Sequence, residues 1–181
     1  MGLFVTEWDV YAQDGLTPKG SSIQKEARDG MQTGQSGDPS KRSALLTGEW
    51  RCVLNQEMMK VESTESFFPD GSAKSQGRIK FQWANELKVE VDLTAESRWR
   101  LSGGQLCDVP RTMTFKSVSE PDNQSIKTLI SAMQMQADKR AQGNIETCRQ
   151  VKTLTASELV LVVSSKTGSA ETVCKPIKGR D

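Results

Sequence analysis

The strongest constraint on the fold is a strict alternation of apolar and charged residues in the middle of the chain. Residues 87–93 read LKVEVDL, with apolar side chains at the odd positions and charged side chains at the even ones. Successive side chains of a β-strand point to opposite faces, so this period of two predicts a strand with one buried face. Similar runs on both sides predict one mostly antiparallel β domain between about Gly48 and Cys174.

Turn residues separate the other alternating runs. Pro69-Asp70-Gly71 and Ser102-Gly103-Gly104 are typical of tight turns between paired strands. Eight or nine strands are expected: 50–54, 60–68, 73–83, 87–93 continuing into 95–101, 105–109, 112–118, 146–153, 159–165 and 170–177. Consecutive hairpins of this kind close most easily into a small barrel or a strongly curved sheet.

The period changes after Val118. Apolar residues recur at intervals of three and four between Ile126 and Ala137, which predicts one face of a helix over residues 125–141. Asp122 or Ser125 is the expected N-cap, and Gly143-Asn144 ends the helix. The fold class is therefore mostly β with one inserted helix.

The chain ahead of the domain has a different composition. Residues 12–43 are rich in Gly, Ser, Gln, Asp and Lys, which cannot offset the ordering entropy of about 1–2 kcal/mol per residue. We expect residues 1–46 to be a largely disordered arm and residues 47–178 to be the barrel domain. The first eleven residues are nevertheless apolar, so Phe4, Trp8 and Tyr11 are candidates for docking onto a partner or a second copy. A frayed terminus is the alternative.

Composition excludes several functions. The chain has 24 Lys and Arg, 23 Asp and Glu, and no histidine. The near-neutral charge argues against nucleic-acid binding, and no apolar run has the length of a membrane span. Without histidine there is no Ser-His-Asp or Cys-His nucleophile, so no enzyme activity, metal or cofactor is expected. Met133 and Met135 lie on different helix faces, which favours packing over a metal site.

Four segments resemble the lipocalin-like (calycin) barrels. Gly48-Glu49-Trp50 resembles the G-x-W motif of that family, and residues 67–72 (FFPDGS) resemble its F-x-x-D-G-[ST] hairpin. Residues 98–106 (RWRLSGGQL) resemble a W-x-[IL]-x-G-[DN]-x-L hairpin, with Gly104 in place of Asp or Asn. Residues 156–161 (ASELVL) resemble a late turn and strand. The helix position departs from the family, whose helix follows the last strand.

The resemblance implies a binding protein. A barrel of this kind encloses a small apolar ligand or acts through its surface. If the barrel holds a cavity, the expected lining residues are Trp50, Phe81, Trp83, Val91, Trp99 and Phe115. The alternative function is a protein–protein component, such as an inhibitor, an immunity protein or an assembly subunit. That component would dock or oligomerise through the N-terminal segment or the inserted helix.

The four cysteines lie at informative places. Cys52 is in the first predicted strand and Cys174 in the last, and closing the meander would bring these strands together. A Cys52–Cys174 disulfide would leave Cys107 to pair with Cys148. Two disulfides would indicate a periplasmic or secreted protein, such as one from a bacterial envelope; four buried thiols would indicate a cytoplasmic one.

Overall fold

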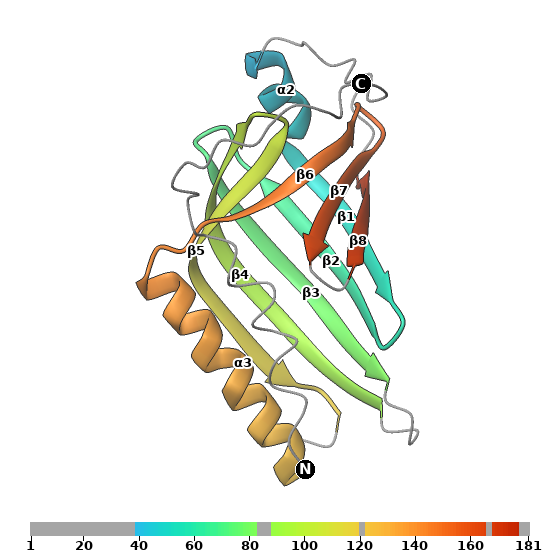
Figure 1. Cartoon of the computed structure of the whole chain (residues 1–181), viewed down its shortest axis with the longest axis vertical. Helices are drawn as coiled ribbons and strands as arrows, with labels where there is room; N and C mark the ends of the chain where they lie inside the picture. The colour runs from blue at the N-terminus through green and yellow to red at the C-terminus, as the bar shows by residue number, and fades with distance from the viewer. Residues whose placement is uncertain (1–38, 83–87, 120–121, 166–167, 178–181) are drawn as a thin grey trace, which may run out of the picture.

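The computed structural model describes residues 39–82, 88–119, 122–165 and 168–177. Eight antiparallel strands form a closed barrel in which every strand pairs with its neighbours in the chain, as Figure 1 shows. The strands are β1 (Gly48–Gln56), β2 (Met59–Phe67), β3 (Ser72–Gln82), β4 (Lys88–Ser102), β5 (Gln105–Ser117), β6 (Thr147–Leu154), β7 (Leu159–Ser165) and β8 (Gly168–Pro176). The predicted mostly-β barrel with one inserted helix is confirmed.

The barrel closes where the first strand meets the last. Trp50 lies opposite Pro176, Cys52 opposite Cys174 and Leu54 opposite Thr172. These inward-facing positions alternate with outward-facing Arg51 and Val53 on β1. Because the last strand pairs with the first, neither β1 nor β8 leaves an open sheet edge along this stretch.

One of the predicted strand pairs is a single long strand: residues 105–109 and 112–118 fall mainly into β5. The predicted continuation of the central alternating run is confirmed, because residues 88–102 form the single strand β4. In β5 the register shifts: Thr112 pairs with Glu96, and Pro110 pairs with Ser97. Arg111 is thus the extra residue of a β-bulge, which reverses the phase of alternation. That reversal is why the sequence suggested a break between two strands.

A short helix, α2 (Pro39–Leu46), closes one end of the barrel (Figure 1). These residues belong to the segment predicted to be a disordered arm, so that prediction was wrong for residues 39–46. Leu46 and Trp50 are both fully buried, and the Trp50 indole Nε1 donates a 2.8 Å hydrogen bond to the Leu46 carbonyl. The last residue of the helix therefore contacts the tryptophan of the Gly48-Glu49-Trp50 motif. This hydrogen bond satisfies the buried indole N–H and positions the chain where it enters β1.

The inserted helix, α3 (Gln124–Gln142), lies between β5 and β6 in the chain. Its N-cap is Asn123, whose side chain accepts hydrogen bonds from the Ser125 and Ile126 amides; the predicted caps Asp122 and Ser125 were wrong. Asn, Asp and Ser are about equally favoured at the N-cap, so residue type alone could not identify which of the three caps the helix.

The prediction that the two methionines lie on different faces of the helix is confirmed: Met133 is buried and Met135 is 56% exposed.

One side chain of α3 attaches the helix to the edge of β5. β5 pairs with β6 only through Gln105–Asp108, so the edge of its second half faces α3. The Gln134 Nε2 donates to the Met113 carbonyl at 2.8 Å, and its Oε1 accepts from the Phe115 amide at 3.2 Å. A side-chain amide thus supplies the donor and acceptor that a neighbouring strand would supply.

The interior is divided into two apolar clusters. The first lies at the α2 end and contains Leu46, Trp50, Cys52, Phe67, Ala73, Leu106, Val151, Leu154, Leu159, Leu161 and Cys174. The second lies beneath α3 and contains Ile79, Phe81, Val89, Val91, Ile126 and Met133. The barrel therefore has two separate apolar cores along its strands. One includes Leu46 of α2, and the other includes Ile126 and Met133 of α3.

Replacing Gln134 by Ala should leave the Met113 carbonyl and the Phe115 amide without their partner. We expect a loss of about 1–3 kcal/mol in the free energy of unfolding, together with faster hydrogen exchange at the Phe115 amide. Gln136→Ala, on the same helix, is the control. Equal exchange at Phe115 in the two variants would show that Gln134 does not hold this edge.

Gly77 should tolerate no side chain. A Cβ at this position of β3 would lie 2.5 Å from the Glu62 carbonyl oxygen and 2.8 Å from the Ser63 Cα. Gly77→Ala should therefore lower the free energy of unfolding by about 1–3 kcal/mol or more, since the clash is with backbone atoms. Gly103→Ala is the comparison, because its φ of 56° is unfavourable but nothing lies within 4 Å of the added Cβ. A smaller loss at Gly77 than at Gly103, measured by denaturant unfolding, would contradict the packing argument.

Candidate functional site

The inner wall changes character between the two apolar clusters. Residues directly opposite one another in an antiparallel ladder share a face, so the register places side chains on the inner or outer wall. Between the clusters, β2, β3 and β4 carry only small or polar inward residues, which we name the inner belt: Ser63, Glu65, Ser75, Gly77, Ala95 and Ser97. All six are partly accessible rather than buried. These side chains are smaller than the large apolar side chains that pack the two clusters.

Glu65 is the charged residue of the inner belt. It lies opposite Trp50 on β1 and Ser75 on β3, which fixes it on the inner wall. Its Oε1 accepts hydrogen bonds from the Ser63 hydroxyl at 3.0 Å and the Ser75 hydroxyl at 2.9 Å. The second carboxylate oxygen has no hydrogen bond of this kind to a neighbouring belt residue, so Glu65 can also accept from a ligand.

A second polar pair lies on the inner wall where β5 meets β6. Asp108 is opposite Trp99, and Arg149 is opposite Leu106, so both side chains share the inner face. The Arg149 Nη2 lies 3.3 Å from the Asp108 Oδ1. Among the described residues, the buried Arg149 Nε has no hydrogen-bond partner. An unsatisfied buried donor is unusual and offers a hydrogen bond to a bound group.

The predicted lining residues do not gather in one place. Trp50 and Trp99 belong to the α2 end, where the Trp99 ring meets Phe67 edge-on at 5.7 Å and its Nε1 donates to the Ser72 carbonyl. The other three described candidates, Phe81, Val91 and Phe115, pack beneath α3. Trp83 lies outside the described residues, as do Phe4, Trp8 and Tyr11. The five described candidates thus border the inner belt from both ends.

Glu65 was not predicted as a site residue, although the sequence contained the signal. In 60–68 the apolar positions Val61 and Phe67 have the same parity as Ser63 and Glu65. Strict alternation therefore places all four on one wall, and a carboxylate on the apolar wall of a strand is unusual enough to single out. The sequence-based site prediction named aromatic and apolar lining residues and did not include this carboxylate.

The outer wall carries ion pairs and two adjoining hollows. Arg78 on β3 forms ion pairs with Asp92 at 2.8 Å and Glu90 at 3.2 Å on β4. These pairs raise the pKa of Arg78, and the hydrogen bond to Asp92 is the largest cause. The larger hollow, of about 520 Å³, is lined by outward polar side chains including Gln76 and Lys116. The smaller hollow, of about 300 Å³, shares Gln76 with it. Both are open and polar, so they do not provide the apolar enclosure that small ligands prefer.

The structure contains both expected disulfides, on opposite faces of the wall. Cys52–Cys174 joins β1 to β8 within the apolar cluster at the α2 end, and both residues are buried. Cys107–Cys148 joins β5 to β6, directly opposite in register. Cys107 lies opposite the outward-facing Arg100 on β4, so this second disulfide belongs to the outer wall.

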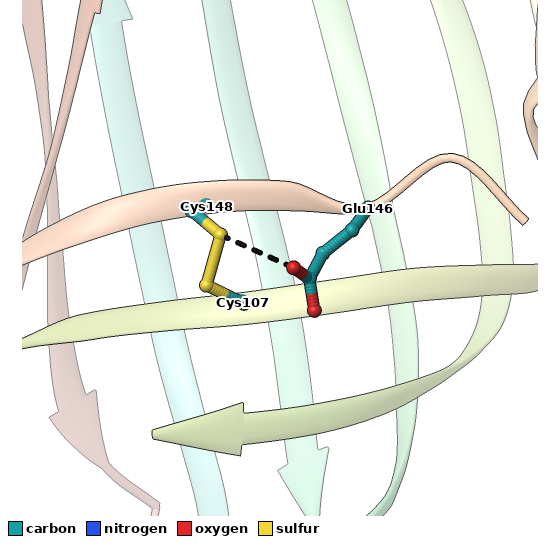
Figure 2. Close-up of side chains that lie close together, drawn as sticks. All are labelled: Cys107, Glu146 and Cys148. Carbon is teal, nitrogen blue, oxygen red and sulfur yellow. Dashed lines mark hydrogen bonds between the residues drawn. A yellow bond between two sulfur atoms is a disulfide. The ribbon is translucent and has the colours of Figure 1, made fainter. Parts of the chain in front are cut away.

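A carboxylate stands beside the outer disulfide, as Figure 2 shows. The Glu146 Oε2 lies 3.8 Å from the Cys148 Sγ, and both Glu146 oxygens accept from Arg100, at 2.8 and 2.7 Å. Cys107, Glu146 and Cys148 have ligand-type atoms within 4.8 Å of one another. Because the two sulfurs are joined to each other, they are not available as thiolate ligands, and this cluster is not a metal site in its oxidised form.

Comparison with known proteins finds no matching family model and no matching curated protein. Neither described helix combines the length and apolar character that crossing a bilayer requires.

The Arg100–Glu146 pair should make stability depend on pH. The hydrogen bond from Arg100 lowers the pKa of Glu146 below its usual 4.5. A lowered folded-state pKa contributes stability above the unfolded pKa, and this contribution is lost as the pH falls. Arg100→Gln should therefore be less stable than wild type at pH 7 in denaturant titrations, with the difference shrinking as the pH falls below the usual pKa of 4.5. Arg111→Gln is the exposed control, and a pH-independent difference for Arg100→Gln would contradict the assignment.

Proposed function

We propose that this chain is a non-enzymatic, lipocalin-like binding module that holds a small ligand in the middle of its barrel. The single observation that carries the proposal is the inner belt. Both barrel ends are filled by apolar clusters, whereas the belt between them is built from small and polar residues that remain accessible. A barrel filled only by its own side chains would place large apolar groups at these positions.

The belt also suggests the character of the ligand. Trp50 and Leu93 border it at opposite ends and offer apolar contact, while Glu65 offers a hydrogen-bond acceptor. The family resemblance implied a small apolar ligand. We propose a ligand with an apolar body and one donor group, such as an amine or a hydroxyl, that reaches the Glu65 carboxylate. The two disulfides support placing such a protein in the periplasm or outside the cell.

Titration with 1-aminoanthracene, a fluorescent apolar ring system with one amine, tests this proposal. We expect saturable binding to the full chain. Ala95→Leu, which fills the belt from β4, should weaken binding by about tenfold or more. Thr94→Leu adds a similar side chain to the outer wall one residue away and should leave binding unchanged.

Glu65→Gln tests the polar contact to the ligand separately from the apolar contacts. It keeps the size of the side chain but removes the charge, and it should weaken the amine probe while leaving unsubstituted anthracene unaffected. Absence of saturable binding, or equal binding by Ala95→Leu and Thr94→Leu, would rule out a ligand in the belt.

A second candidate function is a protein–protein component. The outer wall carries adjacent valines across β1, β8 and β7, because Val53 lies opposite Val173 and Val173 lies opposite Val160. Val173 is 38% exposed and Val160 is only 8% exposed, so the apolar contact that this row offers is small and centred on Val173. Native mass spectrometry distinguishes the two functions: a co-purified small molecule supports the first, and an oligomer that is lost on deleting residues 1–38 supports the second.

A further inference from the structure

The two disulfides differ sharply in how an outside reagent can reach them. Cys52 and Cys174 are 3% and 0% exposed and lie among apolar side chains on the inner wall. In the outer pair, Cys107 is 2% exposed, but Cys148 is exposed. A thiolate must approach a sulfur atom directly to break a disulfide, and Cys148 is the one cysteine of the four whose residue is exposed, so attack at Cys148 is the route that the folded protein offers.

The outer disulfide also stands at a short seam of the barrel. β5 and β6 share four residue pairs, from Gln105↔Gln150 to Asp108↔Thr147, whereas β1 and β2 share nine. Beyond Asp108, β5 turns away from β6 and is covered by α3 instead. The Cys107–Cys148 bond is thus the covalent link across a seam that few backbone hydrogen bonds hold.

The charge beside the exposed sulfur controls the approach of a thiolate. The Glu146 carboxylate lies on the same outer face, 3.8 Å from the Cys148 Sγ (Figure 2). An incoming thiolate is an anion, so this carboxylate repels it. Arg100 partly compensates the repulsion, since its guanidinium is paired with both oxygens of the same carboxylate.

We propose that Cys107–Cys148 is a thiol–disulfide exchange site that works as a reducible latch on the β5–β6 seam. A thiolate of an external dithiol attacks the Cys148 Sγ, the Cys107–Cys148 bond breaks, and Cys107 leaves as a thiolate that takes up a proton. The second thiol of the reagent then attacks the mixed disulfide and releases Cys148. The protein gains two thiols, and the dithiol is oxidised to a disulfide. The Cys52–Cys174 bond remains intact throughout.

Limited reduction of the oxidised full chain tests the latch. The protein is treated under native conditions with dithiothreitol, alkylated with iodoacetamide at intervals, and mapped by peptide mass spectrometry. We expect Cys107 and Cys148 to be alkylated at least about tenfold faster than Cys52 and Cys174. Equal rates at all four cysteines would mean that reduction requires global unfolding, and this result would overturn the proposal.

Glu146→Gln tests the role of the carboxylate. Removing its charge, and freeing Arg100 to attract the thiolate, should speed reduction of the outer disulfide by about three- to fivefold at low salt and less at high salt. Glu158→Gln, which removes an exposed carboxylate paired with Lys175, is the matched control and should leave the rate unchanged. A rate that does not respond to Glu146→Gln would overturn the electrostatic part of the assignment.

Hydrogen exchange on the selectively reduced protein tests the seam. We expect faster exchange in the paired segments Gln105–Asp108 and Thr147–Gln150, with β1 and β8 unchanged. Unchanged exchange at the seam after reduction would show that the bond does not hold it, and would overturn the latch.

Discussion

The structure depends on the pairing of its first strand with its last. A meander of hairpins has two free edges, and the pairing of β1 with β8 removes them by turning the sheet into a barrel. Cys52 and Cys174 lie opposite one another at the centre of this contact and join its strands covalently from the inside. Every inward position, including the inner belt, is defined only because this closure separates an inner wall from an outer one.

The pairing of β5 with β6 covers only the first part of β5, and helix α3 covers the rest of that strand edge. After Asp108 the edge of β5 has no strand beside it, and α3 covers it through Gln134 and an apolar face that includes Met133. This arrangement creates a second core beneath the helix, separate from the core beneath α2. The small and polar residues that carry the proposed function lie between the two cores. The position of the site therefore follows from where α2 and α3 pack against the barrel.

The sequence predicted the barrel well because alternation reports directly on which side of a wall a residue lies. It predicted α3 from a change of period and both disulfides from the order of the strands. It failed where a local feature hides the pattern: the bulge at Arg111 reversed the alternation within β5. The isolation of Glu65 among apolar positions was visible in the sequence, but its contacts with Ser63 and Ser75 depend on register, which only the structure supplies.

The nesting of the two disulfides has a consequence for the unfolded chain. Residues 107 and 148 lie within the segment enclosed by residues 52 and 174, whose sequence separation is 122. In an oxidised unfolded chain, the strands most distant in sequence remain tethered to each other, and a smaller ring sits inside the larger one. Long-range pairing is the slow part of forming an all-β protein, because the ends must first find each other. Here the search that closes the barrel is shortened before refolding begins.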